Sequence, residues 1–143
     1  MIYHWTDAKK ALTALKNNKL QARRWAHYLE NEKRFAKGTS WAKNATRWML
    51  NEPNRVCFVA DETKIANRIH SINGERTYLL TQGLTKKDRD PNAYRHVSST
   101  PDEEFVEGAI SPFIPVLTQI WFCDVTNTEL LVLARKLDIA VVF

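Results

Sequence analysis

The chain has 143 residues, which is the size of one domain that can bury a hydrophobic core of its own. Its composition, 44% hydrophobic and 26% charged, is that of an ordinary globular protein, and no apolar run reaches the length of a membrane span. The net charge of +5 is uneven, since residues 1–60 carry +8, residues 61–100 carry +2 and residues 101–143 carry −5. We therefore expect a single domain over residues 1–143, whose basic front half is either a solvated surface or a contact for a phosphate-bearing partner.

The first expected element is a strand over residues 2–6, in which successive side chains point to opposite faces. His4 and Thr6 then share one face, and Tyr3 and Trp5 share the other. If the aromatic pair lies in the core, His4 faces a groove or water.

A helix is expected next, over residues 7–19, with Thr6 or Asp7 as its N-cap and apolar residues three and four apart. The segments that follow it have weaker patterns. In chain order, we expect an extended stretch at 20–24, either a helix or a long loop at 25–36, and a strand at 55–60.

The second half of the chain is expected to add several strands and one clear helix. In chain order, its elements are a short helix at 61–68, strands at 77–81, 105–110 and 119–125, a helix at 127–137 capped by Thr126 or Asn127, and a strand at 139–143. Residues 86–101 are polar, contain two prolines and have no periodicity, so they predict a loop. Together these elements predict an α+β fold.

The cysteines and the first residues of the chain indicate the cellular compartment in which the protein is expected. Cys57 and Cys123 each lie inside an apolar stretch, and no CxxC motif or Cys/His cluster surrounds them. We therefore expect two buried thiols rather than a disulfide or a metal site. The first residues lack the basic and then apolar pattern of a secretion signal, so a cytoplasmic, reducing environment is expected.

Several motifs for nucleotide, metal or nucleophile chemistry are absent from the sequence. It contains neither GxxxxGK[ST] nor GxGxxG, and its four glycines are too few for a glycine-rich phosphate loop. It has no HExxH, and its four histidines are scattered, so no metal is expected. No GxSxG elbow supports a serine nucleophile.

Three short segments carry the residue types of an active site. They are Tyr3-His4-Trp5-Thr6, Gly38-Thr39-Ser40-Trp41 and Pro101-Asp102-Glu103-Glu104-Phe105-Val106. Taken singly, each has a plain structural interpretation as a strand histidine, a turn or a solvated acidic strand end. In this order and spacing, they resemble the ADP-ribosyltransferase-like families, in particular small bacterial and phage members and the DNA-targeting ADP-ribosyltransferase toxins.

The resemblance implies an ADP-ribosyltransferase-like split two-sheet fold with flanking helices, which holds NAD in a cleft. By this resemblance, His4 hydrogen-bonds a ribose hydroxyl of NAD, with Thr6 beside it, and Ser40 supports the catalytic glutamate. That glutamate stabilises the positive charge on the ribose as nicotinamide leaves. Glu104 is the better match because it directly precedes the apolar strand residues. Glu103 matches if the motif shifts by one residue, which turns the carboxylate to the other face.

Further contacts to NAD follow from the same resemblance. Arg23, Arg24 and Arg47 are candidates for the pyrophosphate because guanidinium groups pair with phosphate at two points. Tyr28 or Trp41 is a candidate for stacking on the nicotinamide or the adenine. Each of these residues also has an ordinary interpretation, as surface charge or as core.

The expected function is that of a mono-ADP-ribosyltransferase with a macromolecular acceptor, and the basic front half favours a nucleic acid over a protein. Lys43 follows the second motif where relatives often carry an arginine, and Asp102 stands where they often carry Glu or Gln, so the acceptor stays open. Two alternatives also stay open. One is a non-catalytic module that binds nucleic acid or protein through interleaved basic and aromatic residues, and the other is a phage-encoded inhibitor on the same scaffold.

Overall fold

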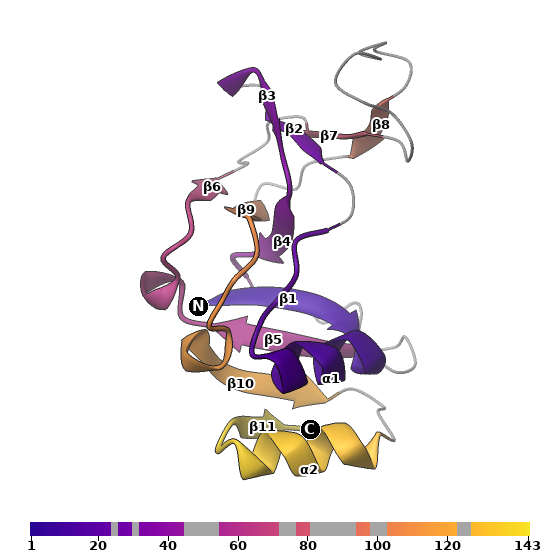
Figure 1. The fold of residues 1–143 in the computed structure, drawn as a ribbon, viewed down its shortest axis with the longest axis vertical. Helices are drawn as coiled ribbons and strands as arrows, with labels where there is room; N and C mark the ends of the chain where they lie inside the picture. The colour runs from indigo at the N-terminus through magenta and orange to yellow at the C-terminus, as the bar shows by residue number, and fades with distance from the viewer. Residues whose placement is uncertain are drawn as a thin grey trace. The chain divides into compact units, whose positions relative to one another are not determined.

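The computed structural model of the chain describes several stretches of backbone, which are coloured in Figure 1. They are residues 1–23, 26–29, 32–44, 55–71, 77–80, 94–97, 103–122 and 127–143, with side chains described throughout except at residues 28, 77–80 and 94–97. The chain forms two compact units. The first consists of Met1–Leu20, Trp41–Ala66 and Ile110–Phe143, and the second of Gln21–Ser40 and Asn67–Ala109.

The first unit is built on strands in the order β11-β10-β5-β1. They are β1 (Ile2–Asp7), β5 (Arg55–Ala60), β10 (Leu117–Phe122) and β11 (Ala140–Val142). β5 pairs antiparallel with β1 and with β10, whereas β10 and β11 are parallel, with a helix in the connection between them. Strand β4 (Gly38–Ala42) gives its last two residues to this unit, and Ala42 pairs with Tyr3 of β1.

The helices of the first unit are α1 (Ala8–Asn17) and α2 (Thr128–Lys136), and each begins at a side-chain cap. The carboxylate of Asp7 accepts a hydrogen bond at 2.7 Å from the backbone N–H three residues on, and the amide oxygen of Asn127 does the same at 3.0 Å. These caps satisfy N–H groups that have no partner within the first turn. The prediction of both helices is confirmed, although each helix is shorter than expected. Of the two candidates for each cap, the structure has Asp7 and Asn127.

The face of β1 that carries His4 is the buried one, which corrects the idea that the aromatic pair takes the core. His4 is 7% exposed, and its ring lies against that of Trp41 with the centroids 5.0 Å apart. Tyr3 and Trp5 are only partly buried on the other face, where both rings contact Trp121.

The reason is the apolar layer that covers the His4 face. His4 lies opposite Phe58 in the register of β1 and β5, and the Phe58 ring packs edge-on against Phe113 at 5.0 Å. Phe113 is held just beyond the end of α1, because its backbone N–H donates to the side chain of Asn18 at 2.9 Å. The layer that includes Phe113 therefore buries this face, and the alternation of the strand alone does not indicate which face that will be.

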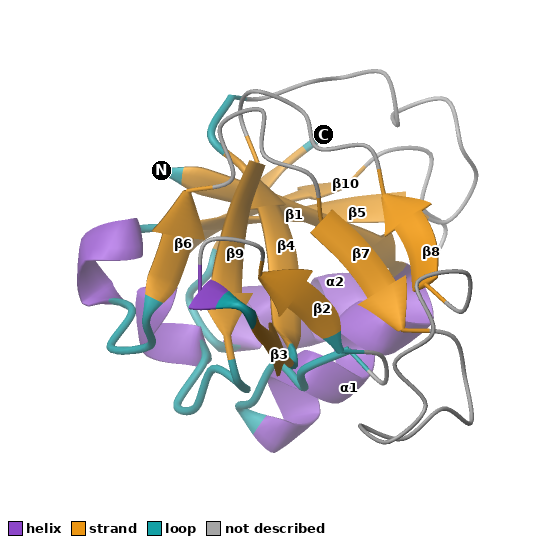
Figure 2. Ribbon diagram, turned by 90° about the horizontal axis from the view of Figure 1, so that it is seen from above, coloured by secondary structure: helices purple, strands orange, loops and turns teal. Residues whose placement is uncertain are grey.

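The second unit contains the first three residues of β4 and two groups of strands (Figure 2). In one group, β6 (Ile69–Ser71) pairs antiparallel with β9 (Glu103–Glu107), which neighbours β4 in the strand order. The other group is an antiparallel sheet with the order β3-β2-β7-β8, formed by β3 (Arg34–Ala36), β2 (His27–Leu29), β7 (Thr77–Leu80) and β8 (Tyr94–Val97). Leu29, Ala36 and Phe105 form a buried cluster from β2, β3 and β9.

Three local predictions are wrong. Residues 25–36, expected as a helix or a long loop, contain the hairpin of β2 and β3. Residues 86–101, expected as a loop, contain β8. The helix expected at 61–68 is reduced to a 3₁₀ turn at Glu62–Lys64. In the two strand cases, pairing with a neighbouring strand decides the conformation, and a weak local pattern does not oppose it.

The α+β class predicted from the sequence agrees with this mixture of helices and mostly antiparallel strands. Cys57 is a buried thiol of β5, as expected, and Cys123 lies outside the described residues. Within the described part of the chain, no helix combines the length and the apolar character needed to cross a membrane.

Candidate active site

The register of β6 and β9 turns the two adjacent glutamates of the third motif to opposite faces of their strand. Ser71 lies opposite Glu104, and His70 lies opposite Phe105. Because side chains alternate along a strand, Glu104 lies on one face, while Glu103 and Phe105 lie on the other. The choice between the two carboxylates is therefore a choice between two different environments.

Glu104 is a buried carboxylate held by a hydroxyl. It is 7% exposed, and its Oε1 accepts a hydrogen bond from the Oγ of Ser71 at 3.1 Å. A carboxylate is costly to bury unless hydrogen bonds replace those it made with water, so this contact helps to hold it in place. A carboxylate fixed in this way can stabilise a positive charge that develops next to it.

Glu103, which is 9% exposed, lies in the field of a guanidinium instead. Although Arg23 is exposed at the surface, desolvation by the surrounding protein lowers its pKa, and the charge of Glu103 opposes that shift. The backbone N–H of Arg23 also donates to the carbonyl of Gly38 at 2.9 Å, which fixes the chain beside β4. Arg23, a candidate for the pyrophosphate of NAD, thus has the buried carboxylate of Glu103 as an electrostatic neighbour.

Gly38 brings β4 close to β9. A Cβ at this position would lie 2.0 Å from the carbonyl oxygen of Val106 and 2.8 Å from the ring of Phe105. No side chain fits there, so the glycine of the second motif has a packing role rather than a turn role. Ser40, two residues further along β4, points to the same side of the strand as Gly38.

His27 is a buried residue that sequence reasoning missed. Its side chain is 0% exposed, and its ring lies on that of Phe105 with the centroids 4.7 Å apart. Within the described part of the chain, neither ring nitrogen has a hydrogen-bond partner. Burial, helped by the charge of Arg23, lowers the pKa of His27 from 6.5 to about 4, so the imidazole is neutral at pH 7. Its segment, WAHYLE, has no clear periodicity that would have indicated a core position.

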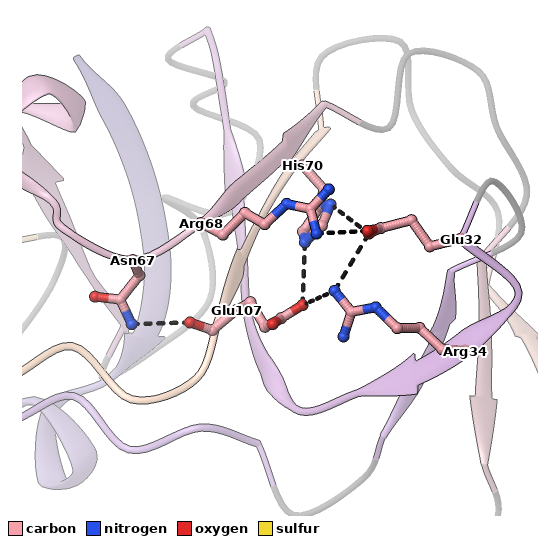
Figure 3. A network of polar contacts seen from close by, with 6 residues as sticks. All are labelled: Glu32, Arg34, Asn67, Arg68, His70 and Glu107. Atoms are coloured by element: carbon pink, nitrogen blue, oxygen red, sulfur yellow. Dashed lines mark hydrogen bonds and ion pairs between the residues drawn. The ribbon is translucent and has the colours of Figure 1, made fainter.

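A second polar cluster lies on the Glu103 side of β9 and is drawn in Figure 3. Glu32, between β2 and β3, contacts Arg34, Arg68 and the Nδ1 of His70, the first and third at 3.2 and 3.3 Å. Glu107 of β9 contacts Arg34 and the Nε2 of His70, the latter at 3.1 Å. We call these five residues the ion-pair network. The hydrogen bond from Arg34, with a further one from His70, holds the pKa of Glu107 below its usual value.

The ion-pair network ties the β2–β3 hairpin to β6 and β9 rather than forming a second reactive site. Both carboxylates are engaged by guanidinium groups and by one imidazole. Next to it, the side-chain amide of Asn67 donates to the carbonyls of Glu107 and Ala109 at 2.8 and 2.7 Å. Among the described residues, no group of three or more His, Cys, Asp or Glu is placed to hold a metal ion.

The predicted site residues fall into three groups. Ser40, Glu103 and Glu104 lie on neighbouring strands of the second unit, whereas His4 and Thr6 are buried on β1 in the first unit. Arg24, Arg47 and the side chain of Tyr28 lie outside the described residues. Trp41, a candidate for stacking on NAD, is 2% exposed.

Comparisons with family models, with curated proteins and with solved structures found no match. The functional assignment therefore depends on the geometry of these residues and on the resemblance of the three motifs.

Proposed function

We propose that the chain is a mono-ADP-ribosyltransferase that transfers ADP-ribose from NAD to a macromolecular acceptor, with Glu104 as its catalytic carboxylate. The observation that supports this most directly is the placement of Glu104. It is buried at the start of β9, a hydroxyl fixes it, and it faces away from the ion-pair network. Such a carboxylate suits chemistry in which a cation forms on a sugar.

In the proposed reaction, the bond between the anomeric carbon of the ribose and the nicotinamide nitrogen breaks. Its electron pair leaves with nicotinamide, and positive charge develops on the ribose. The ionised carboxylate of Glu104 stabilises that charge where it forms. A nucleophilic atom of the acceptor then bonds to the anomeric carbon and releases its proton to solvent or to a basic group. No redox step is required.

The remaining roles come from the resemblance alone. His4 and Thr6 are proposed to contact the ribose, Arg24 and Arg47 to bind the pyrophosphate, and Tyr28 to stack on a ring of NAD. The resemblance also gives Ser40 the role of supporting the glutamate, but Ser40 shares the side of Gly38 and Phe105, which is that of Glu103 and not of Glu104. The buried thiol of Cys57 is compatible with the cytoplasmic setting proposed for an NAD-consuming enzyme.

Two of the residues that a nucleic-acid-binding module would use are not available for such contacts in the described part of the chain. Trp41 is buried and presents no face on which a base could stack, and Arg34 is paired with two carboxylates. The uneven charge of the chain still favours a nucleic acid as the acceptor of the proposed transfer.

The test is nicotinamide release from NAD by the purified protein, with and without a cell lysate as a source of acceptors. We expect release that depends on the lysate and that falls on the order of 10²-fold or more in Glu104→Gln. Glu129→Gln, at an exposed glutamate of α2, is the matched control and should keep full activity. Loss in Glu103→Gln with activity intact in Glu104→Gln would assign the chemistry to the other carboxylate. The absence of release under every condition would refute the enzyme proposal, and steeply salt-dependent binding of nucleic acid without NAD would favour a binding module.

A further inference from the structure

We infer that Ser71 is a positioning residue for Glu104, which rests on the function proposed above. None of the three motifs contains Ser71, and the resemblance gives it no role. Its hydroxyl donates to the Oε1 of Glu104 at 3.1 Å from the neighbouring strand. The serine of the second motif, Ser40, belongs to a different strand, β4.

The register of the strands makes this contact a fixed feature of the second unit. Ser71 is the last residue of β6 and lies directly opposite Glu104 in the antiparallel pairing with β9. Directly opposite side chains in such a pair are neighbours, so a hydroxyl at this position reaches the carboxylate without a long flexible side chain. Ser71 is an exposed residue, whereas Glu104 is buried.

The ion-pair network supports the same register from the other face of the strands. His70 precedes Ser71 and points the opposite way, where its two ring nitrogens contact Glu32 and Glu107 (Figure 3). Since Glu107 belongs to β9, the contact between His70 and Glu107 joins β6 to β9. A slip of β6 by one residue would break this contact and would also remove Ser71 from Glu104.

The chemical consequence is an oriented carboxylate. The hydrogen bond from Ser71 restricts the rotation of Glu104 and holds its Oε1 in one place. Because Ser71 acts through Glu104, its loss should affect the chemical step and leave the affinity for NAD nearly unchanged. We expect kcat to fall about tenfold in Ser71→Ala, with KM for NAD changing by less than about twofold.

The experiment measures kcat and KM for nicotinamide release in five variants, which are Ser71→Ala, Ser71→Thr, Thr118→Val, Glu104→Gln and the double variant of Ser71→Ala with Glu104→Gln. Ser71→Thr keeps the hydroxyl and should restore most of the activity lost in Ser71→Ala. Thr118→Val removes a hydroxyl that donates to the carbonyl of Val59 in the first unit, and should have no effect. Ser71→Ala combined with Glu104→Gln should be no slower than Glu104→Gln alone, because the carboxylate that Ser71 orients is already absent from Glu104→Gln.

The outcomes separate the two proposals. An active wild-type enzyme with an unchanged kcat in Ser71→Ala, or an additional loss of activity in the double variant, would overturn the role of Ser71 and leave the transferase intact. A rise in KM without a fall in kcat would also overturn it. A wild-type protein that releases no nicotinamide would refute the transferase, and the role of Ser71 with it. Circular dichroism of each variant confirms that the comparison is between folded proteins.

Discussion

The buried imidazole of His27 makes the stability of the second unit depend on pH. The unfolded chain takes up a proton on this residue near pH 6.5, whereas the folded protein does so only near pH 4, because burial and the charge of Arg23 oppose the cation. Between these two values, the unfolded state binds more protons than the folded state. Above pH 6.5, the titration of His27 does not reduce the free energy of unfolding. As the pH falls from 6.5 to about 4, the free energy of unfolding declines, and below about pH 4 His27 causes no further loss.

The size of the effect follows from the two pKa values. One pKa unit corresponds to about 1.4 kcal/mol, so acidification from pH 7 to pH 4 should remove about 3 kcal/mol through His27 alone. That is a large fraction of the total stability of a domain of this size, which is about 5–15 kcal/mol. A second effect applies at every pH, because a buried polar group without a partner costs about 1–3 kcal/mol.

The variant that tests this reasoning is His27→Leu, which places an apolar side chain of similar size against Phe105. The free energy of unfolding is measured by chemical denaturation of both proteins at several pH values from 7.5 to 4. We expect His27→Leu to be at least as stable as the wild type at pH 7.5, and its advantage to grow by about 3 kcal/mol toward pH 4. Carboxylates titrate in both proteins and cancel in the difference. Parallel stability curves would refute the reasoning, because the imidazole would then have a partner for its proton in the folded state.

Two further substitutions test the packing and the charges of the second unit. Gly38→Ala should lower the free energy of unfolding by more than about 2 kcal/mol, since its Cβ would lie 2.0 Å from the carbonyl oxygen of Val106 and must displace β9. Thermal unfolding measures the change in stability. A variant as stable as the wild type would contradict the close approach of β4 and β9. Arg34→Gln removes the main hydrogen bond that lowers the pKa of Glu107 from 4.5. The folded protein should then lose less stability as the pH falls below 4.5. If the free energy of unfolding depends on pH below 4.5 as it does in the wild type, Arg34 does not set the pKa of Glu107. Arg135→Gln, at an exposed arginine of α2, is the control for the loss of one positive charge.

Local signals explain which elements the sequence predicted correctly. Both helices combine an apolar stripe with a capping side chain, at Asp7 and at Asn127, and these signals lie within one helical turn of the boundary that they mark. The strands β1 and β5 are rich in aromatic and β-branched residues. In such elements, the residues of the segment itself are sufficient to predict its secondary structure.

The β2–β3 hairpin carries no comparable signal. Hairpin turns are usually marked by glycine or asparagine where φ is positive, but among the described residues of this turn the positive φ, of 50°, belongs to Lys33. Its strands are three residues each, too short to display an alternating pattern. The hairpin is stabilised instead by residues distant in sequence, through Phe105 in the core and Glu107 at the surface. For the same reason, His27 was not recognisable as a core residue.

The candidate site was predictable as a pair of glutamates, but the sequence could not separate one from the other. Adjacent carboxylates in a strand look equivalent until a register assigns each a face and a partner. In this chain, Glu103 lies in the field of Arg23, whereas Glu104 accepts a hydrogen bond from the neutral hydroxyl of Ser71. The hydrogen bond from Ser71 orients Glu104 directly, whereas Arg23 acts on Glu103 through its charge. If Glu104 is the catalytic carboxylate, removing the positive charge with Arg23→Gln should therefore affect transferase activity far less than removing the hydroxyl of Ser71.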